Sequence, residues 1–239
     1  MAVVHVIVVF AISIVDIVNA AFPGYGLVVT TGGARIPLRQ IRAGDSVLVV
    51  KPDGLSTYFD TLYSISSLNA TAVNNNVDMY EICLEAHRAE RAGPQHANNR
   101  GPLVEPACLD VTADHLVFDA NMTSHRAREV KVGQLLRHVK PNGQVTVSAV
   151  RSVVQHDGDK THKNELYTPL TYSGTIVVND VVASTYVMHH TLNHAVLAPK
   201  RVYYATQSFL GHKPWPQYIQ DTIVIIVIIV FAIIVRPRG

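Results

Sequence analysis

The stretch that decides the fold runs from Ile41-Arg42-Ala43-Gly44-Asp45 to Lys51-Pro52-Asp53-Gly54, because the chain contains it twice. The second copy begins at residue 130 rather than 41, which is 89 residues later, and reads Val130-Lys131-Val132-Gly133-Gln134, then Lys140-Pro141-Asn142-Gly143. The match continues without a gap from Ile41–Ile65 to Val130–Val154. Unrelated hairpins would not share this spacing of two glycines and a Lys-Pro pair. We therefore expect two related halves around a pseudo-two-fold axis.

Each copy has the pattern of a β-hairpin. A strand is predicted at Ser46 to Val50 in the first copy and at Leu135 to Val139 in the second, and a Pro-Asp-Gly or Pro-Asn-Gly turn leads to a further strand. Other segments rich in Val, Ile and Thr are also predicted strands: Leu27 to Thr30, Ala34 to Leu38, Met79 to Leu84, Cys108 to Thr112, Thr175 to Asn179 and Val181 to Met188. The insertion Glu85 to Pro106 lacks periodicity and is predicted to be a loop. The predicted fold class is all-β, with a helical or irregular tail after about Leu192.

Charge excludes one class of partner. The 239 residues carry 20 basic and 18 acidic side chains, which gives a formal net charge of +2. So small an excess produces no strong field, and nothing favours binding of nucleic acid. Between its two apolar ends the chain has about two hundred residues, enough for one β domain with its own core. No cofactor is expected, and the sequence indicates no particular oligomeric state.

The N-terminus, residues 1–20, is predicted to be a signal peptide. Val3 to Val15 is apolar, and Val18-Asn19-Ala20 offers small residues where signal peptidase reads before a cut. Because no Lys or Arg precedes the apolar run and Asp16 follows it, an uncleaved anchor is the alternative. Either interpretation places the chain in the secretory pathway, extracellular or held at a membrane.

The C-terminus is apolar from Thr222 to Val235 and ends in Arg236-Pro237-Arg238-Gly239. A helix of that length reaches about 21 Å, against about 30 Å of hydrocarbon. A single-pass transmembrane helix, a lipid-anchor signal and a buried helix therefore remain open, and the basic end favours a membrane helix with its C-terminus inside. We expect membrane lipid to be the partner of residues 222–235, with 202–221 as a juxtamembrane segment.

Two kinds of covalent site depend on the secretory interpretation. Cys83 and Cys108, the two cysteines of the chain, lie in predicted strands and form either one disulfide or two buried thiols. Asn69-Ala70-Thr71 and Asn121-Met122-Thr123 are acceptor sequences for N-glycosylation.

The candidate chemistry lies in Thr112-Ala113-Asp114-His115, at the end of a predicted strand. When the chain turns between them, the Thr112 hydroxyl and the His115 imidazole can meet at one point. Histidine can protonate a leaving amide nitrogen, and threonine can orient the amide. His190 and His194 are spaced to bind a metal on a helix, but no Cys or carboxylate completes a set. We expect no metal there, only solvated or hydrogen-bonded surface histidines.

Taken together, these motifs resemble the hedgehog-type Hint domain, the autoprocessing module shared with inteins. The resemblance covers about Ala21 to Arg201, in order and in spacing. It rests on Ala21-Phe22-Pro23-Gly24, Gly44-Asp45-Ser46-Val47-Leu48, Thr112-Ala113-Asp114-His115-Leu116, Pro169-Leu170-Thr171, Gly174-Thr175-Ile176-Val177-Val178-Asn179, Ala183-Ser184-Thr185-Tyr186, His194 and Leu197-Ala198-Pro199. It implies a Hint domain at 21–201 with a pseudo-symmetric, mostly β fold, in agreement with the repeat.

The resemblance also implies a two-stage reaction. In the family, a first-residue Cys attacks the carbonyl before it, and an N-to-S acyl shift turns the peptide bond into a thioester while the Thr-x-x-His pair activates that bond. A second nucleophile, cholesterol in hedgehog proteins, then takes the acyl group. Carried to this chain, the scissile bond is Ala20–Ala21 and the activating residues are Thr112 and His115. A sterol or another small nucleophile is then the expected second partner.

This chain departs from the family pattern at three positions. Ala21 occupies the place of the nucleophilic Cys, and a methyl group cannot attack a carbonyl. The sterol-activating Asp falls near Ser66, unless Asp60 has taken over that role. Thr185 replaces the Cys of the family's Ala-Ser-Cys-Tyr stretch. Tyr25 and Thr30 are the neighbouring hydroxyls to weigh as substitute nucleophiles.

Two functional hypotheses follow. The first is a self-processing, intein-like autoprotease fold that is inactive because Ala21 replaces the nucleophile. The second is a non-catalytic, membrane-tethered extracellular β module that binds a protein or a lipid.

Overall fold

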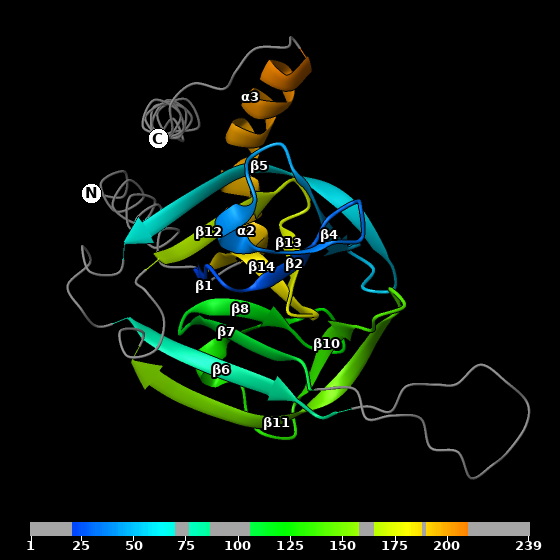
Figure 1. Cartoon of the computed structure of the whole chain (residues 1–239), viewed down its shortest axis with the longest axis vertical. Helices are drawn as coiled ribbons and strands as arrows, with labels where there is room; N and C mark the ends of the chain where they lie inside the picture. The colour runs from blue at the N-terminus through cyan, green and yellow to red at the C-terminus, as the bar shows by residue number, and fades with distance from the viewer. Residues whose placement is uncertain (1–20, 70–76, 87–105, 158–164, 188–189, 210–239) are drawn as a thin grey trace, which may run out of the picture.

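A computed structural model describes residues 21–69, 77–86, 106–157, 165–187 and 190–209. Its strands form a four-stranded sheet, an eight-stranded sheet and a small two-stranded hairpin, and two helices follow near the C-terminal end of the described chain (Figure 1). The all-β expectation is confirmed. The predicted signal segment 1–20, most of the insertion 85–106, and the apolar segment 222–235 lie outside the described residues.

The two sequence copies form two matching sets of elements. The first set is β2 (Leu27–Val29), β3 (Arg35–Pro37), a 3-10 turn (Leu38–Gln40), β4 (Ser46–Val50) and β5 (Thr57–Asn69). The second set is β8 (His115–Phe118), β9 (Ser124–Arg126), a 3-10 turn (Ala127–Glu129), β10 (Leu135–Val139) and β11 (Val145–Asp157). The sets correspond from their first strands onward, so the repeat begins earlier than the sequence match at Ile41 suggested.

Turn geometry repeats with the same spacing. Gly44 and Gly133 have φ of 100° and 85°, and Gly54 and Gly143 have φ of 71° and 82°. Residues with side chains seldom adopt such left-handed conformations, which is why glycine recurs there. Three positive-φ positions of the first half recur in the second, the third pair being Gly33 at 75° and Met122 at 60°. The backbone therefore supports the pseudo-two-fold relation independently of the side chains.

The match is not gapless in the structure. In the first hairpin Val50 pairs with Thr57, whereas in the second Val139 pairs with Val145, so the second loop is one residue shorter. Both long strands then carry a register irregularity, next to Leu62 in β5 and next to Val150 in β11. These two positions are 88 residues apart, one fewer than the offset of 89, as the shorter second loop requires. The ungapped alignment of the sequence was therefore wrong by one residue along β5 and β11, because a loop can lose a residue while the strands after it keep their shape.

The remaining strands complete the two large sheets. They are β1 (Phe22–Pro23), β6 (Asp78–Leu84), β7 (Cys108–Thr112), β12 (Glu165–Thr171), β13 (Thr175–Val178) and β14 (Val181–Val187). The smaller sheet has the order β1-β12-β5-β4, and the larger has β7-β6-β11-β10-β14-β8-β9, with β13 paired to β14. The first strand therefore lies at an edge of the smaller sheet, where it also meets β7 of the larger one.

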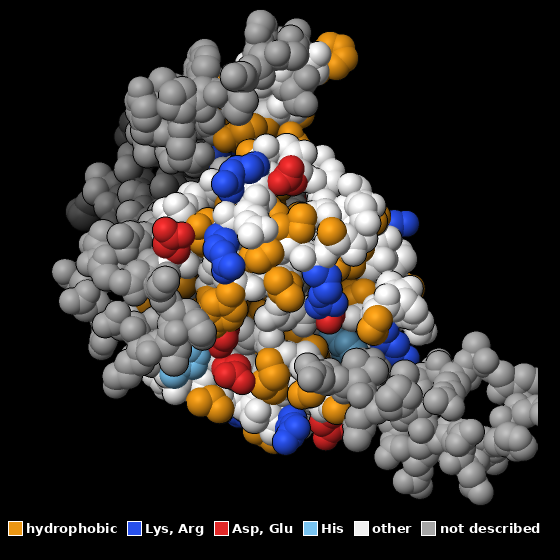
Figure 2. Space-filling model, in the orientation of Figure 1, with side chains coloured by type: hydrophobic (Ala, Val, Ile, Leu, Met, Phe, Trp, Pro, Cys, Tyr) orange, Lys and Arg blue, Asp and Glu red, His pale blue; other side chains and the backbone are white. Residues whose placement is uncertain are grey.

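A single main core joins the two halves. Its buried residues come from both sequence copies and include Val47, Leu62, Leu136 and Val150. Arg137 is also buried, and its guanidinium donates hydrogen bonds to the carbonyls of Gly54 and Ala120. One arginine thus ties a turn of the first half to the second. The face in Figure 2 carries basic, acidic and apolar side chains intermixed, with no large patch of one charge.

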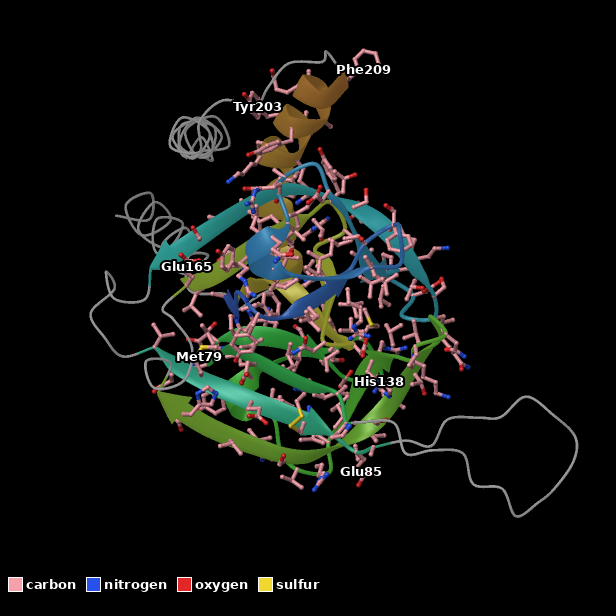
Figure 3. The ribbon with its side chains drawn as sticks, in the orientation of Figure 1. Met79, Glu85, His138, Glu165, Tyr203 and Phe209 are labelled. Atoms are coloured by element: carbon pink, nitrogen blue, oxygen red, sulfur yellow. A yellow bond between two sulfur atoms is a disulfide. The ribbon has the colours of Figure 1, made fainter. Side chains whose placement is uncertain are left out.

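Two helices contact strands of both large sheets, and the second projects beyond them. Helices α2 (His190–Val196) and α3 (Ala198–Phe209) follow β14, and α3 extends away from the sheets in Figure 1. A tyrosine-rich cluster that includes Tyr63, Tyr186 and Tyr204 holds them. Phe209, at the end of α3 in Figure 3, is exposed. Within the described residues, no helix is long and apolar enough to cross a membrane.

Candidate functional site

Ala21 and Thr112 contact each other through both backbone and side chain. The Ala21 amide N–H donates to the Thr112 hydroxyl oxygen at 3.2 Å, and the Thr112 N–H donates to the Ala21 carbonyl at 3.2 Å. Ala21 is 1% exposed, directly before β1, and Thr112 ends β7. The structure therefore brings together the nitrogen of the expected scissile bond and the expected orienting hydroxyl. Ala20, on the other side of that bond, lies outside the described residues.

His115 begins β8 and lies against the residue after Ala21. Its ring meets that of Phe22 edge-on, with 4.2 Å between centroids, and its exposed fraction is 1%. Its Nε2 is 2.8 Å from the Ser184 carbonyl oxygen, an atom that only accepts hydrogen bonds, so we assign the proton to Nε2. The other ring nitrogen, Nδ1, is buried without a hydrogen-bond partner among the described residues.

Burial sets the protonation state of His115. Loss of hydration lowers the pKa of His115 to about 4, and the hydrogen bond to Ser184 opposes this only in part. The imidazole is therefore neutral at pH 7, with an unshared electron pair on Nδ1. A neutral imidazole can accept a proton, and its low pKa makes the protonated form a stronger acid than an ordinary imidazolium.

Neither candidate substitute nucleophile is free at this site. The Tyr25 hydroxyl donates to the Asp110 carboxylate, and burial, followed by this hydrogen bond, raises the pKa of Tyr25 far above its usual value. The Thr30 hydroxyl donates to the Ala34 carbonyl at 3.4 Å, in the turn after β2. Both hydroxyls therefore have structural partners, and neither is close to a thiolate in reactivity.

The two candidate sterol-base positions lie at different distances from Ala21. Phe22 pairs with Tyr167, so the ladder places Ala21 level with Thr168, which pairs with Ser66. Two strand spacings therefore separate Ser66 from Ala21, about 10 Å.

Asp60 lies six residues further along β5, about 20 Å of strand away. Its carboxylate accepts hydrogen bonds from the N–H groups of Thr61 and Ser173. The structure brings Ser66, and not Asp60, toward the site.

The histidines of α2 are partly buried and hydrogen-bonded. His190 and His194 are both partly buried, and their rings stack with 6.1 Å between centroids. The Nδ1 atom of His190 bonds the Ser184 hydroxyl at 2.8 Å, and that of His194 bonds the Tyr186 hydroxyl at 3.0 Å. The expectation of hydrogen-bonded histidines is confirmed, and the rings are less exposed than expected because they pack between β14 and α2.

Sequence reasoning missed the role of Ser184, whose carbonyl fixes His115. The residue stands inside a recognised motif, but a backbone oxygen has no sequence signal of its own. The irregular pairing of β14 with β8 would have been needed to find it.

The two cysteines lie in neighbouring strands. Cys83 and Cys108 form a disulfide that joins β6 to β7. Within the described chain, the one group of three potential metal ligands comprises these cysteines and Glu81, and disulfide sulfurs cannot act as thiolate ligands.

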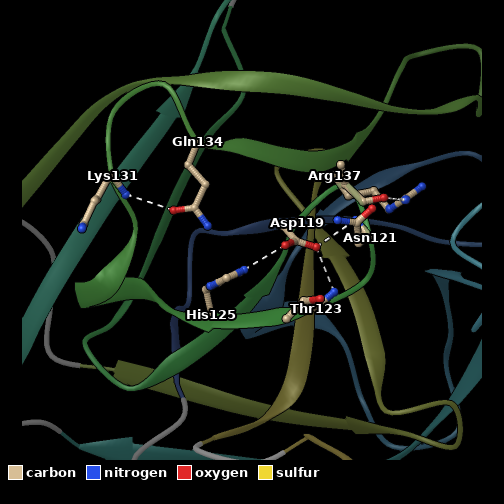
Figure 4. Close-up of polar contacts among 8 residues, drawn as sticks. Asp119, Asn121, Thr123, His125, Lys131, Gln134 and Arg137 are labelled. Atoms are coloured by element: carbon tan, nitrogen blue, oxygen red, sulfur yellow. Dashed lines mark hydrogen bonds and ion pairs between the residues drawn. The ribbon is translucent and has the colours of Figure 1, made fainter.

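The described residues include the whole Asn121-Met122-Thr123 sequon but only the first residue, Asn69, of the other. Asn121 is exposed in the β8–β9 turn, where its N–H donates to Asp119 (Figure 4). Asn69 ends β5, where it pairs with Glu165.

Comparison with known proteins identifies relatives over most of the chain. A family model described as the Hint module matches residues 13–223. The chain is 28% identical over 204 residues to the Indian hedgehog protein of Xenopus laevis, and 29% identical over 194 residues to that of Gallus gallus. These matches cover 83% and 78% of this chain, but 44% and 42% of the relatives. The chain therefore spans less than half the length of these curated relatives.

A solved structure shows the same fold at low sequence identity. The crystal structure of the Ssp DnaB mini-intein variant M86 has a TM-score of 0.50 at 11% identity, covering 72% of this chain and 97% of that one. A crystal structure of a mutant of the same variant also has a TM-score of 0.50 at 11% identity, covering 72% and 95%. At such identity the likeness concerns the fold alone.

Proposed function

This chain belongs to the Hint family of hedgehog and intein type, and from that premise we propose that it is a self-processing module that retains the groups activating the Ala20–Ala21 bond but lacks the nucleophile. One observation carries the proposal. The Ala21 N–H is held by the Thr112 hydroxyl, and the buried, neutral His115 lies against Phe22. The hydroxyl thus bonds the nitrogen of the expected scissile bond and the imidazole lies against the next residue, which favours amide activation by this pair.

The proton path follows from the hydrogen bonds of His115. Because Nε2–H is engaged by Ser184, Nδ1 is the nitrogen that can exchange a proton with the reacting groups. In the active form of the reaction, Nδ1 would take the proton of a thiol, and the thiolate sulfur would attack the carbonyl carbon of Ala20. As the carbon–nitrogen bond breaks, the same proton would pass to the leaving nitrogen, which leaves a thioester upstream and a free amine at residue 21.

Ala21 stops this sequence at its first step. The methyl group has no proton to lose and no electron pair to donate, so no thioester can form. Transfer to a sterol lacks a second requirement, because the candidate position nearer to Ala21 holds Ser66 in place of a carboxylate, and Asp60 is bonded elsewhere. Serine has no charge with which to activate a hydroxyl at neutral pH. We therefore expect the chain as it stands to be inert in both stages.

The second candidate is a non-catalytic extracellular module that binds protein or lipid. The Cys83–Cys108 disulfide favours a secretory location, since such bonds persist in oxidising compartments. Its proposed membrane attachment through residues 222–235 rests on the sequence alone. A binding role would not need the precise pairing of Thr112 with Ala21, and this is the feature that separates the two candidates.

The test is to restore the thiol. A small soluble protein is fused in place of residues 1–19, upstream of Ala20, and the unmodified chain is compared with Ala21→Cys by intact mass after addition of a small thiol. We expect the unmodified fusion to stay whole and the A21C fusion to split between residues 20 and 21. A folded A21C protein that remains whole would contradict the proposal and leave the binding module.

A further inference from the structure

Strand β14 is irregular where it passes the candidate site. Ala183 pairs with Val117 and Val187 pairs with His115, so residues 184–186 of β14 lie opposite Leu116 alone. Such a bulge changes the direction of backbone groups that would otherwise extend the ladder. Here the Ser184 carbonyl accepts the Nε2–H of His115 at 2.8 Å. The bulge thus supplies the one hydrogen bond that fixes the His115 ring.

The Ser184 side chain closes the bulge on itself. Its oxygen accepts the N–H of Tyr186 at 2.9 Å and lies 2.8 Å from Nδ1 of His190. A backbone N–H can only donate, so the hydroxyl keeps its own hydrogen for another partner, and we assign that hydrogen to a bond with an unprotonated Nδ1 of His190. Burial lowers the pKa of His190 to about 4, with a smaller contribution from the neighbouring His194, and this agrees with a neutral ring. One hydroxyl thus links the bulge to helix α2.

The His190 ring is held by its surroundings. It meets Phe118 edge-on at 5.2 Å between centroids and lies 5.4 Å from the ring of Tyr186. A Cβ added to Gly174 would come within 3.1 Å of His190 Cε1, so little space is left for the ring to move. The ring is therefore a rigid acceptor for the Ser184 hydroxyl, supplied by an element outside both sheets.

We propose that Ser184 and His190 are positioning residues, whose hydrogen bond holds the β14 bulge so that the Ser184 carbonyl fixes the orientation and the Nε2–H tautomer of His115. Neither residue touches the reacting bond. Through His190, helix α2 therefore determines which nitrogen of His115 is left to exchange a proton with the scissile bond. Positioning of this kind by a second layer of hydrogen bonds is typical of functional histidines.

The first test needs no activity. In the chain as it stands, the His115 Nε2–H should give a proton resonance in nitrogen-resolved NMR that exchanges slowly with water, because it is buried and bonded. We expect His190→Ala to accelerate that exchange at least about tenfold, since the bulge can then open locally. His190→Asn should preserve the slow exchange, because Asn Oδ1 can take the place of Nδ1 as acceptor.

The matched control is His194→Asn. His194 lies on the same helix and bonds Tyr186, but it does not contact the Ser184 hydroxyl. Unchanged exchange in a folded His190→Ala protein would overturn the proposal, and so would equal acceleration in the His194→Asn control. Should His190→Ala fail to fold, Ser184→Ala takes its place as the deciding variant, because it removes the hydroxyl and keeps the carbonyl.

The second test rests on the proposed function. In the A21C fusion, His190→Ala and Ser184→Ala should slow cleavage roughly 10- to 100-fold, while His190→Asn should stay close to its parent. If A21C itself does not cleave, the proposed function fails but the NMR measurement still decides the positioning role. If A21C cleaves and His190→Ala does so at the same rate with slow exchange retained, the positioning role fails alone.

Discussion

The two halves of the molecule share a backbone and differ in what their side chains can do. Leu48 in the first half is Arg137 in the second, and Ile36 is His125. The turns keep the same positive-φ positions in both halves. Apolar alternation and turn geometry are therefore enough to form this skeleton, and the polar residues of the second half are additions to it.

The halves also differ in the link that leads to the candidate site. Residues 85–107 join β6 to β7 in the first half, whereas three residues, Tyr172 to Gly174, join β12 to β13. The Cys83–Cys108 disulfide closes the long link at its base, and Cys108 begins the strand that ends at Thr112. Substitutions at the positions where the halves differ should show which of these differences the stability of the fold depends on.

The largest effect on stability should come from the disulfide. Replacing both Cys83 and Cys108 by Ala frees a loop with a sequence separation of 25 in the unfolded state. Loop-closure entropy predicts a loss of about 3.5 kcal/mol in the free energy of unfolding. Urea unfolding of the two proteins measures it. An unchanged midpoint and slope would mean that the long link does not need its closure.

A smaller loss of stability is expected when Arg137 is replaced by leucine, the residue at the matching position 48 of the first half. Arg137→Leu leaves the carbonyls of Gly54 and Ala120 without their donor, at a cost of about 2 kcal/mol. Leu48→Ile, at the matching position of the first half, keeps an apolar side chain and serves as the control. Chemical denaturation measures both losses. Equal stability of Arg137→Leu and the parent would show that the arginine is not needed to join the halves.

The turn pair Gly33 and Met122 isolates backbone strain. A Cβ at Gly33 would touch nothing within 4 Å, so Gly33→Ala should destabilise only through its φ of 75°, by about 1 kcal/mol. Met122→Gly should be close to neutral, because relief of strain offsets the lost contacts of its side chain. Thermal unfolding compares the two variants. A larger loss for Met122→Gly than for Gly33→Ala would contradict this assignment.

The smallest effect on stability should appear at low pH and concerns Asp119. Partial burial alone would raise the pKa of Asp119, but hydrogen bonds from His125, Thr123 and Asn121 outweigh it and lower that pKa (Figure 4). A carboxylate with a lowered pKa stabilises the fold above its unfolded pKa, and this contribution disappears as pH falls through the folded value. Asp119→Asn should therefore flatten the stability profile below about pH 4. A parallel profile in both proteins would exclude the contribution.

Much of the fold could be predicted from the sequence, because its signals are local. Strands β4 and β10 were predicted with their observed ends, and the repeat indicated the symmetry. Strands β8 and β9 were missed, since His115, Asp119 and His125 interrupt the apolar alternation by which β2 and β3 were found. Extending the 89-residue offset upstream would have aligned β8 and β9 with those strands.

The site was only partly predictable. Thr112, His115 and Ala21 stand in motifs, so the contact of Thr112 with Ala21 and the placement of His115 beside Phe22 agree with expectation. The partner of His115 is a backbone oxygen whose direction depends on the register of β14 against β8, and no residue type signals a register shift. Asp60 stays an untested candidate for the sterol base, and the structure adds that it lies six residues from Ser66 along β5.

The most direct test of the proposed chemistry is the dependence of restored cleavage on His115. The rate of splitting of the A21C fusion at pH 7 is compared with that of the same fusion carrying His115→Ala, both checked for folding by circular dichroism. General acid–base catalysis predicts a loss of at least about 100-fold. Equal rates would contradict the proposal, because the new thiol would then cleave the bond without proton transfer by His115.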